Sequence, residues 1–323
     1  MKELNHEATI EYEESMTGMV KLKFFDTVRR KITYPIRFYK NKKALKEALY
    51  FNTDGLNATE SRKKKIVVSL TSYPGRINVV PATISTLLRQ TVKPDKIVLW
   101  LGEEKFPNQK LPDIFEDLKR YGIEIRFRPD LKSHTKYFYA IQEFPEDIII
   151  TVDDDNLYQK NLIEELYNSY NQYPNCVSAL RVHRIRFNDD CTIKKYNEWH
   201  YEYCGKTGSC SHQYFATGVG GVLYPPHALH PEVTNLEIIQ RYCHNHDDLW
   251  LKIMEVMNGT KVVIAGNSKV KYTEAIIGSQ ETAQWKENVV CGGGDRQIDA
   301  VLSVYNEFLQ NGKTLCEIMA FDE

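Results

Sequence analysis

The sequence predicts an α/β fold in which helices cover both faces of a largely parallel sheet. Short runs rich in Ile and Val, such as KIVVSL and DIIITV, alternate with longer segments whose apolar residues follow a helical pattern. These runs are apolar throughout, as expected for strands buried on both faces. A length of 323 residues, with 42% hydrophobic and 26% charged residues, suits one large globular unit or two lobes.

The expected elements alternate along the chain. The expected strands are 65–70, 95–101, 123–127, 147–152, 176–182 and 261–266. The expected helices are 79–91, 111–122, 135–144, 159–173, 246–259 and 295–312. Because strands that alternate with helices form parallel sheets, we expect ligands to gather where the carboxyl ends of the strands meet.

The first 64 residues form an N-terminal extension to this pattern. Within it, residues 21–46 are rich in Lys and Arg, interleaved with Phe and Tyr. Two interpretations remain open for this segment: a solvated helical extension, or an interfacial segment that contacts a partner or anionic lipid. Residues 52–65 have the composition of a linker.

Charge and cysteine content narrow the class of protein. A net charge of −1 gives no overall field that would select nucleic acid. The seven cysteines include no CxxC pair, which favours reduced thiols in a cytoplasmic protein. No signal peptide is recognisable, and no apolar run reaches the length needed to span a membrane.

Three consecutive aspartates, Asp153 to Asp155, directly follow the expected strand 147–152. One capping residue would explain one aspartate but not three. A calcium loop would need a glycine that this stretch lacks. A Mg²⁺ or Mn²⁺ site fits better, because such ions bind one or two carboxylates and complete their shell with water and substrate phosphates.

Other charged residues are candidates for the same site. No glycine-rich phosphate loop is present, so side chains and metal would have to manage phosphate charge. Lys136 is a candidate cation, although a solvated helix lysine explains it equally well. The pair Asp247 and Asp248 opens the expected helix 246–259, where acids also favour a helix N-terminus. A zinc site at Cys243, His244 and His246 has no second half at the usual spacing.

Five stretches together carry a resemblance to a known group. They are VVSLTSYPGRI (67–77), LLRQTVKPDKIVLWL (87–101), TVDDDNLY (151–158), ATGVGGVLYPP (216–226) and HDDLWLK (246–252). In this order the chain resembles bacterial glycosyltransferases of the GT-A fold, similar to the family 2 enzymes of capsule, lipopolysaccharide and exopolysaccharide synthesis. The resemblance covers roughly residues 65–300. It implies a nucleotide-sugar-binding half, 65–182, and an acceptor-binding and catalytic-base half, 183–323.

The resemblance also implies roles on the donor side. Asp153 and Asp155 would be the DxD pair that binds Mn²⁺ or Mg²⁺, with Asp153 nearer the ribose and Asp155 in direct metal contact. The remaining nucleotide-binding residues would come from the first strand and its loop, from the triplet and from the helix just upstream of the metal strand: Ser69, Thr71, Tyr73, Arg76, Asp154 and Lys136.

On the acceptor side, the resemblance implies that Asp248 is the catalytic base, with Asp247 as the alternative one residue away. Gly220, Gly221, His246 and Trp250 would line the sugar and acceptor side, and Gly218 would allow close backbone approach. Asp295 could join the site or cap the last helix.

The expected function is metal-dependent transfer of a hexose or N-acetylhexosamine from a UDP-sugar to a glycan hydroxyl, with inversion. We expect the acceptor to be lipid-linked, at the inner face of the cytoplasmic membrane. Three alternatives remain: a retaining enzyme, a sugar-phosphate nucleotidyltransferase, and an inactive paralogue that only binds glycan or nucleotide.

Overall fold

The computed structural model describes residues 38–39, 42–49, 55–279, 292–305 and 307–322. The chain divides into two compact units, Met1–Glu47 and Ala48–Glu323. The basic, aromatic segment 21–46 therefore lies mostly outside the described residues, and the account below concerns the second unit. Among the helices that are described, none combines the length and apolar character needed to cross a bilayer.

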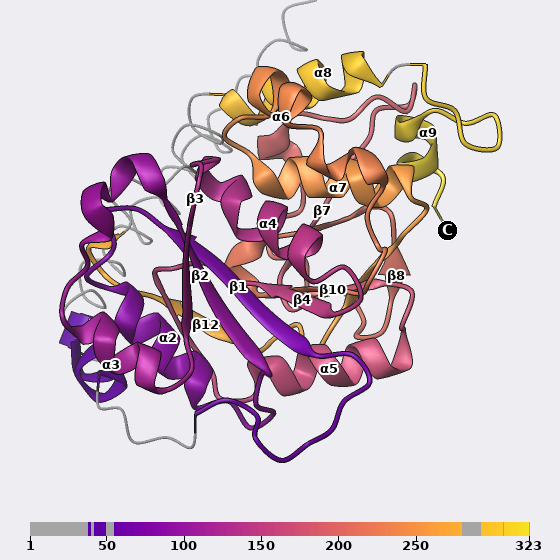
Figure 1. The fold of residues 1–323 in the computed structure, drawn as a ribbon. Helices are drawn as coiled ribbons and strands as arrows, with labels where there is room; N and C mark the ends of the chain where they lie inside the picture. Colours follow the sequence, from indigo (N-terminus) through magenta and orange to yellow (C-terminus); the bar gives the residue numbers. More distant parts are fainter. Residues whose placement is uncertain (1–37, 40–41, 50–54, 280–291, 306, 323) are drawn as a thin grey trace, which may run out of the picture. The chain divides into compact units, whose positions relative to one another are not determined.

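An eight-stranded sheet forms the centre of the second unit (Figure 1). Its strands, in spatial order, are β3 (Glu124–Arg128), β2 (Lys96–Gly102), β1 (Ile66–Ser72), β4 (Ile148–Thr151), β10 (Val222–Tyr224), β6 (Val177–Ala179), β11 (Val262–Ile264) and β8 (Cys210–Ser211). The first four are mutually parallel, and β6 is parallel to β11. Only β10 and the edge strand β8 run antiparallel to their neighbours.

Two small ribbons accompany this sheet. β12 (Thr273–Ala275) pairs with β5 (Asn156–Tyr158), and β7 (Val182–Arg184) pairs with β9 (Tyr214–Ala216). Short 3-10 turns complete the connections: η1 (Glu103–Lys105), η2 (Pro107–Gln109), η3 (Lys132–His134), η4 (Tyr196–Glu198), η5 (Gly218–Gly220) and η6 (Pro231–Thr234).

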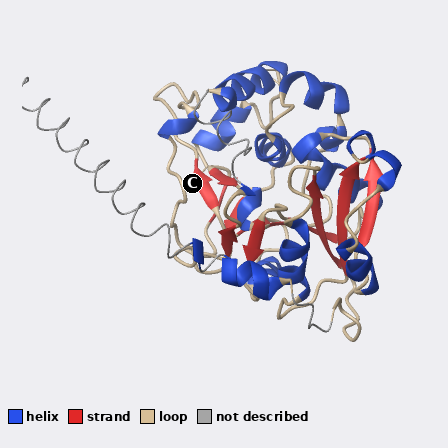
Figure 2. Cartoon of the chain, turned by 90° about the vertical axis from the view of Figure 1, so that its left-hand side faces the viewer, coloured by secondary structure: helices blue, strands red, loops and turns tan. Residues whose placement is uncertain are grey.

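Helices lie on both sides of the strands (Figure 2). One face is covered by α2 (Val80–Leu88), α3 (Ile114–Arg120) and α5 (Leu162–Gln172). The other is covered by α4 (Thr135–Glu143), α6 (Leu236–Tyr242), α7 (Asp247–Met257), α8 (Gly293–Val304) and α9 (Leu315–Ala320). The predicted α/β class, with a mostly parallel sheet and helices on both faces, is confirmed.

The pattern of β1 explains why the sheet is buried on both faces. Ile66, Val68 and Leu70 point into the core that contains α2 and α5, whereas Val67 points into the core that contains α4 and α7. Because successive strand residues face opposite sides, an uninterrupted apolar run supplies both cores.

Three predicted elements differ in their extent. The strand expected at 176–182 is divided into β6 and β7, and the helix expected at 295–312 ends at Val304. The helix expected from residue 159 begins at Leu162, because residues 159–161 form a turn between β5 and the helix. At the break between β6 and β7, Gly220 packs so closely on Arg181 that an added Cβ would lie 2.5 Å from the Arg181 Cβ.

Candidate functional site

The acidic triplet, Asp153–Asp155, lies just beyond the carboxyl end of β4, and its backbone is held by neighbouring elements. The backbone N–H of Asp153 donates to the Tyr158 hydroxyl at 2.8 Å. The Thr83 hydroxyl donates to the Asp154 carbonyl at 2.8 Å, and the Ile276 N–H donates to the Asp155 carbonyl at 2.8 Å. These contacts from α2, β5 and the segment after β12 fix the direction of the three carboxylates.

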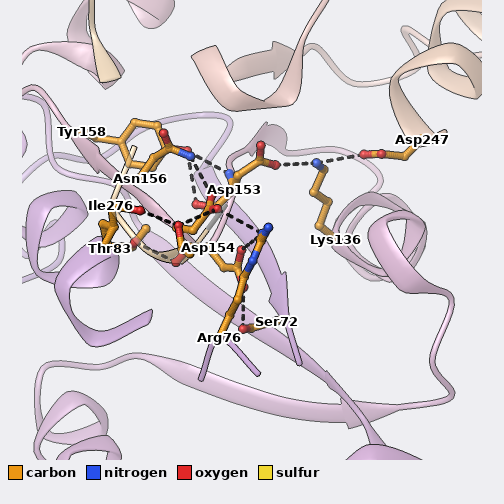
Figure 3. A network of polar contacts seen from close by, with 12 residues as sticks. Ser72, Arg76, Thr83, Lys136, Asp153, Asp154, Asn156, Tyr158, Asp247 and Ile276 are labelled. Atoms are coloured by element: carbon orange, nitrogen blue, oxygen red, sulfur yellow. Dashed lines mark hydrogen bonds and ion pairs between the residues drawn. The ribbon is translucent and has the colours of Figure 1, made fainter. Parts of the chain in front are cut away.

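Asp154 is bound within the protein. Its buried carboxylate accepts hydrogen bonds from the Ser72 hydroxyl at 2.6 Å and from Arg76 Nη1 at 3.0 Å (Figure 3). The same Arg76 nitrogen lies 3.2 Å from Asp155 Oδ2. Burial raises the pKa of Asp154, and the Arg76 guanidinium opposes that rise. Arg76, predicted to contact the nucleotide, thus serves here as the counter-ion of two aspartates.

Asp155 has further polar contacts besides its ion pair with Arg76. Its carboxylate accepts hydrogen bonds from Asn156 Nδ2 at 2.9 Å and from the Ser279 hydroxyl at 3.0 Å. Burial, together with repulsion from Asp153, raises the pKa of Asp155 to about 7. A carboxyl group in this state would gain from a nearby cation.

Lys136 connects the acidic triplet to the start of α7. Its Nζ donates to Asp153 Oδ1 at 2.8 Å and lies 2.9 Å from Asp247 Oδ2 (Figure 3). The side chain is buried rather than solvated. Burial alone would lower the pKa of Lys136, but Asp153, Asp247 and Asp248 raise it well above its ordinary value, so the ammonium stays charged.

The two acids of α7 have different environments. Burial would raise the pKa of Asp247, but Lys136 and then His134 hold it far below its usual range. Asp248 Oδ1 accepts a hydrogen bond from the Gly218 N–H at 3.1 Å. Burial, followed by repulsion from Asp247, raises the pKa of Asp248 to about 8. One acid is therefore a fixed anion, and its neighbour can accept a proton near neutral pH.

Gly218 lies where these groups meet. A Cβ on this residue would lie 2.8 Å from Lys136 Nζ and 3.3 Å from an oxygen of both Asp153 and Asp248. Gly221, by contrast, has a φ of +81° and faces Leu162. Gly220 packs on Arg181, so of the three glycines it is Gly218 that contacts the acids.

Other residues predicted for the site support it or lie in the core. The Ser69 hydroxyl donates to the Lys136 carbonyl and accepts from Trp100 Nε1 at 2.8 Å. The Thr71 hydroxyl donates to the Trp100 carbonyl at 3.0 Å. Tyr73 lies beside Arg76, whose guanidinium carbon is 5.7 Å from the ring centroid. Ser69 thus contacts Lys136 and Tyr73 contacts Arg76, whereas Thr71 binds the neighbouring strand β2.

The remaining predicted residues belong to α7 or to its neighbours. Trp250 is fully buried, and its indole donates to the Val233 carbonyl at 2.9 Å, so it is a core residue. His246 caps α7 by accepting from the Leu249 N–H at 3.4 Å. The Asp295 carboxylate accepts from the Tyr196 N–H at 2.7 Å and so joins α8 to η4.

The residues around the triplet suit a hard divalent cation, because carboxylates outnumber cations among the described residues of the site. Among the residues that the structure describes, five carboxylates, Asp153, Asp154, Asp155, Asp247 and Asp248, lie close to two cations, Lys136 and Arg76. Within the described residues, no three His, Cys, Asp or Glu side chains form a preassembled metal site. An ion held by one or two carboxylates would take its other ligands from water and substrate phosphates.

Several contributors were missed by the sequence analysis. Ser72, Asn156 and Ser279 all bond a carboxylate of the acidic triplet. Ser72 lies in the stretch 67–77 and Asn156 in the stretch 151–158. Both could have been predicted, because they are polar residues next to the end of an expected strand. Ser279 is 124 positions from its partner Asp155, and nothing local indicates that pairing.

Comparisons with known proteins give limited help. No protein-family model matches the chain, and no curated protein matches it at a significant level. Among solved structures, the chain is similar to residues 1–349 of TarS from S. aureus, a wall teichoic acid glycosyltransferase, at a TM-score of 0.41 and 11% sequence identity. The match covers 65% of this chain and 60% of the TarS chain. The function must therefore be argued from the site itself.

Proposed function

We propose that this chain is a GT-A-type glycosyltransferase that moves a hexose or N-acetylhexosamine from a UDP-sugar to a hydroxyl group of a glycan, with inversion. The strand order β3-β2-β1-β4 places an acidic triplet at the carboxyl edge of the parallel part of the sheet, which is where α/β proteins bind ligands. The five quoted stretches that resemble GT-A enzymes include both the triplet and the start of α7.

The observation that carries this proposal is the double contact of Lys136. Its Nζ lies 2.8 Å from Asp153 Oδ1 and 2.9 Å from Asp247 Oδ2. This single side chain brings the end of β4, suited to a metal-bound diphosphate, beside the start of α7, suited to a general base. A sugar transfer needs those two functions at adjacent places.

The chemistry follows from the charges. Asp153 and Asp155 would hold Mg²⁺ or Mn²⁺, which would neutralise charge that develops on the leaving UDP. Asp248 takes the proton of the acceptor hydroxyl as the new bond forms between that oxygen and the anomeric carbon. The bond from the anomeric carbon to the diphosphate breaks on the opposite side, which inverts the configuration. Gly218 holds the Asp248 carboxylate through its N–H at 3.1 Å.

A UDP-release assay over a panel of UDP-sugars, with and without Mn²⁺, tests the proposal. Slow donor hydrolysis makes an acceptor unnecessary. We expect metal-dependent release with at least one donor, and a loss of about 100-fold or more in Asp155→Ala. Asp117→Ala on α3, where the side chain is 53% exposed, is the matched control and should behave as wild type. A folded protein that binds no UDP-sugar and releases no UDP would contradict the proposal.

A further inference from the structure

A second group of polar and aromatic residues lies beside the proposed base and has no part in the chemistry above. Thr217 directly precedes Gly218, whose N–H is bonded to Asp248. The Thr217 hydroxyl accepts from Arg181 Nη1 at 2.8 Å and donates to the Arg181 carbonyl at 3.3 Å. The Arg181 guanidinium is thereby fixed to the same loop that holds the base.

Arg181 forms a solvent-facing pair with Glu202. Glu202 Oε1 lies 3.3 Å from Arg181 Nε and 3.2 Å from Nη2. The side chains are 30% and 58% exposed, respectively. Glu202 also has a φ of +44°, a left-handed conformation that is strained for a residue with a side chain. Strained residues of this kind are concentrated at binding and catalytic sites.

Tyr201 presents a fixed aromatic surface next to this pair. Tyr201 is 40% exposed, and its ring lies against the buried His183 and Tyr196. The ring centroid lies 4.6 Å from that of His183 and 5.7 Å from that of Tyr196. The Tyr201 hydroxyl donates to the Tyr196 carbonyl at 3.1 Å, which limits rotation of the ring. Tyr196 in turn packs on His246 at the start of α7, with 5.7 Å between centroids.

We propose that Arg181, Tyr201 and Glu202 form a subsite for an uncharged pyranose residue of the acceptor. The exposed tyrosine ring can pack against the C–H face of a sugar, because its body is apolar and rigid. The carboxylate accepts hydrogen bonds from sugar hydroxyls, and the guanidinium donates to their oxygens. This inference rests on the proposed glycosyltransferase function and specifies the acceptor for it.

The ion pair between Arg181 and Glu202 favours an uncharged acceptor sugar over an anionic one. A lone arginine beside the base would favour a phosphate or a carboxylate. Here the Glu202 carboxylate already lies 3.2 Å from the guanidinium, so an incoming anion would meet a like charge. A sugar that offers only hydroxyl groups can bond both members of the pair without separating them.

The test measures how strongly added p-nitrophenyl glycosides stimulate UDP release from the active UDP-sugar. The probes are a panel of neutral glycosides and p-nitrophenyl glucuronide as the anionic comparison. We expect a neutral glycoside to stimulate release. In Tyr201→Ala the KM for the neutral glycoside should rise about tenfold or more, and the KM for the UDP-sugar donor should change much less. Tyr201→Phe, which keeps the ring, should retain most of the stimulation.

Two further variants sharpen the test. Glu202→Gln should shift preference towards the glucuronide at least about fivefold, because it leaves Arg181 as a single cation. Tyr170→Ala on α5, where Tyr170 stacks on Tyr167, is the matched control and should behave as wild type. Thermal unfolding of each variant checks that it is folded.

Three results would overturn the subsite: an unchanged glycoside KM in folded Tyr201→Ala, stronger stimulation of wild type by the glucuronide, and UDP release that no neutral glycoside stimulates. Absence of UDP release with every donor would instead overturn the proposed function, and the subsite with it.

Discussion

Lys136 carries the positive charge on which the arrangement of the acids depends. Its buried ammonium faces Asp153, Asp247 and Asp248. Burial, followed by repulsion from the anionic Asp247, raises the pKa of Asp248 to about 8. Asp247 and Asp248, adjacent in the first turn of α7, therefore differ in protonation. Asp247 stays an anion, and Asp248 can take up a proton as a base.

Gly218→Ala tests the close approach of these groups. The added methyl would lie 2.8 Å from Lys136 Nζ and 3.3 Å from oxygens of Asp153 and Asp248. We expect transfer activity to fall about 10- to 100-fold, because small displacements of reacting groups are costly. The free energy of unfolding should change by less than about 1 kcal/mol, since the ammonium end of a lysine can shift. Wild-type kinetics in folded Gly218→Ala would show that the spacing is unimportant.

The sequence could indicate the chemistry of these residues but not their pairing. Asp153, Asp155 and Asp248 are recognisable from their position at the start or end of an element. That Arg76 would pair with the triplet was not predictable, because it is 78 positions from Asp154. The same holds for Lys136, whose partner Asp247 belongs to a helix more than 100 residues away.

At the scale of elements, the buried His134 of η3 joins the start of α4 to Cys243 at the end of α6. His134 Nε2 lies 2.7 Å from the Cys243 carbonyl and Nδ1 lies 2.8 Å from the Tyr137 hydroxyl. Nε2 must donate to the carbonyl, whereas the Tyr137 hydroxyl can either donate to Nδ1 or accept from it. Burial lowers the pKa of His134 to about 4.

This junction should make stability depend on pH. The unfolded chain, with a histidine pKa of about 6.5, binds more protons than the folded chain between pH 6.5 and 4. His134 therefore contributes stability that is fully present above pH 6.5 and is lost as pH falls, by about 3 kcal/mol in total. Urea unfolding at pH 5, 6 and 7 should show a shallower pH dependence for His134→Gln than for wild type. Parallel curves for the two proteins would contradict this.

The elements that sequence predicts well are those with a strong local pattern. β1 to β4 and α2 to α5 are long or continuously apolar, and their existence and order were predicted. β10 is a strand of three residues preceded by glycines, and its antiparallel place between β4 and β6 depends on contacts far along the chain. The division into β6 and β7 lies beside a close contact of Gly220 with Arg181, and no local pattern reveals that contact.

At the scale of the whole second unit, the site forms where an early part of the chain and a later part pair in one sheet. The strands before residue 182 supply the acidic triplet, and β10, from the later part, pairs directly with β4. The loop before β10 carries Gly218, and α7, further along the chain, carries Asp248. The chain has a net charge of only −1. The excess of acids at the site is therefore a local concentration of charge, not a property of the composition.

The most direct test of the account measures sugar transfer and UDP-sugar binding in Asp248→Asn. The amide keeps the shape of the side chain but cannot take the acceptor proton. We expect the donor Kd to stay within about threefold of wild type, while transfer falls about 10²- to 10⁴-fold, the usual contribution of a general base. Transfer at the wild-type rate in this variant would show that α7 does not supply the base and would contradict the central claim.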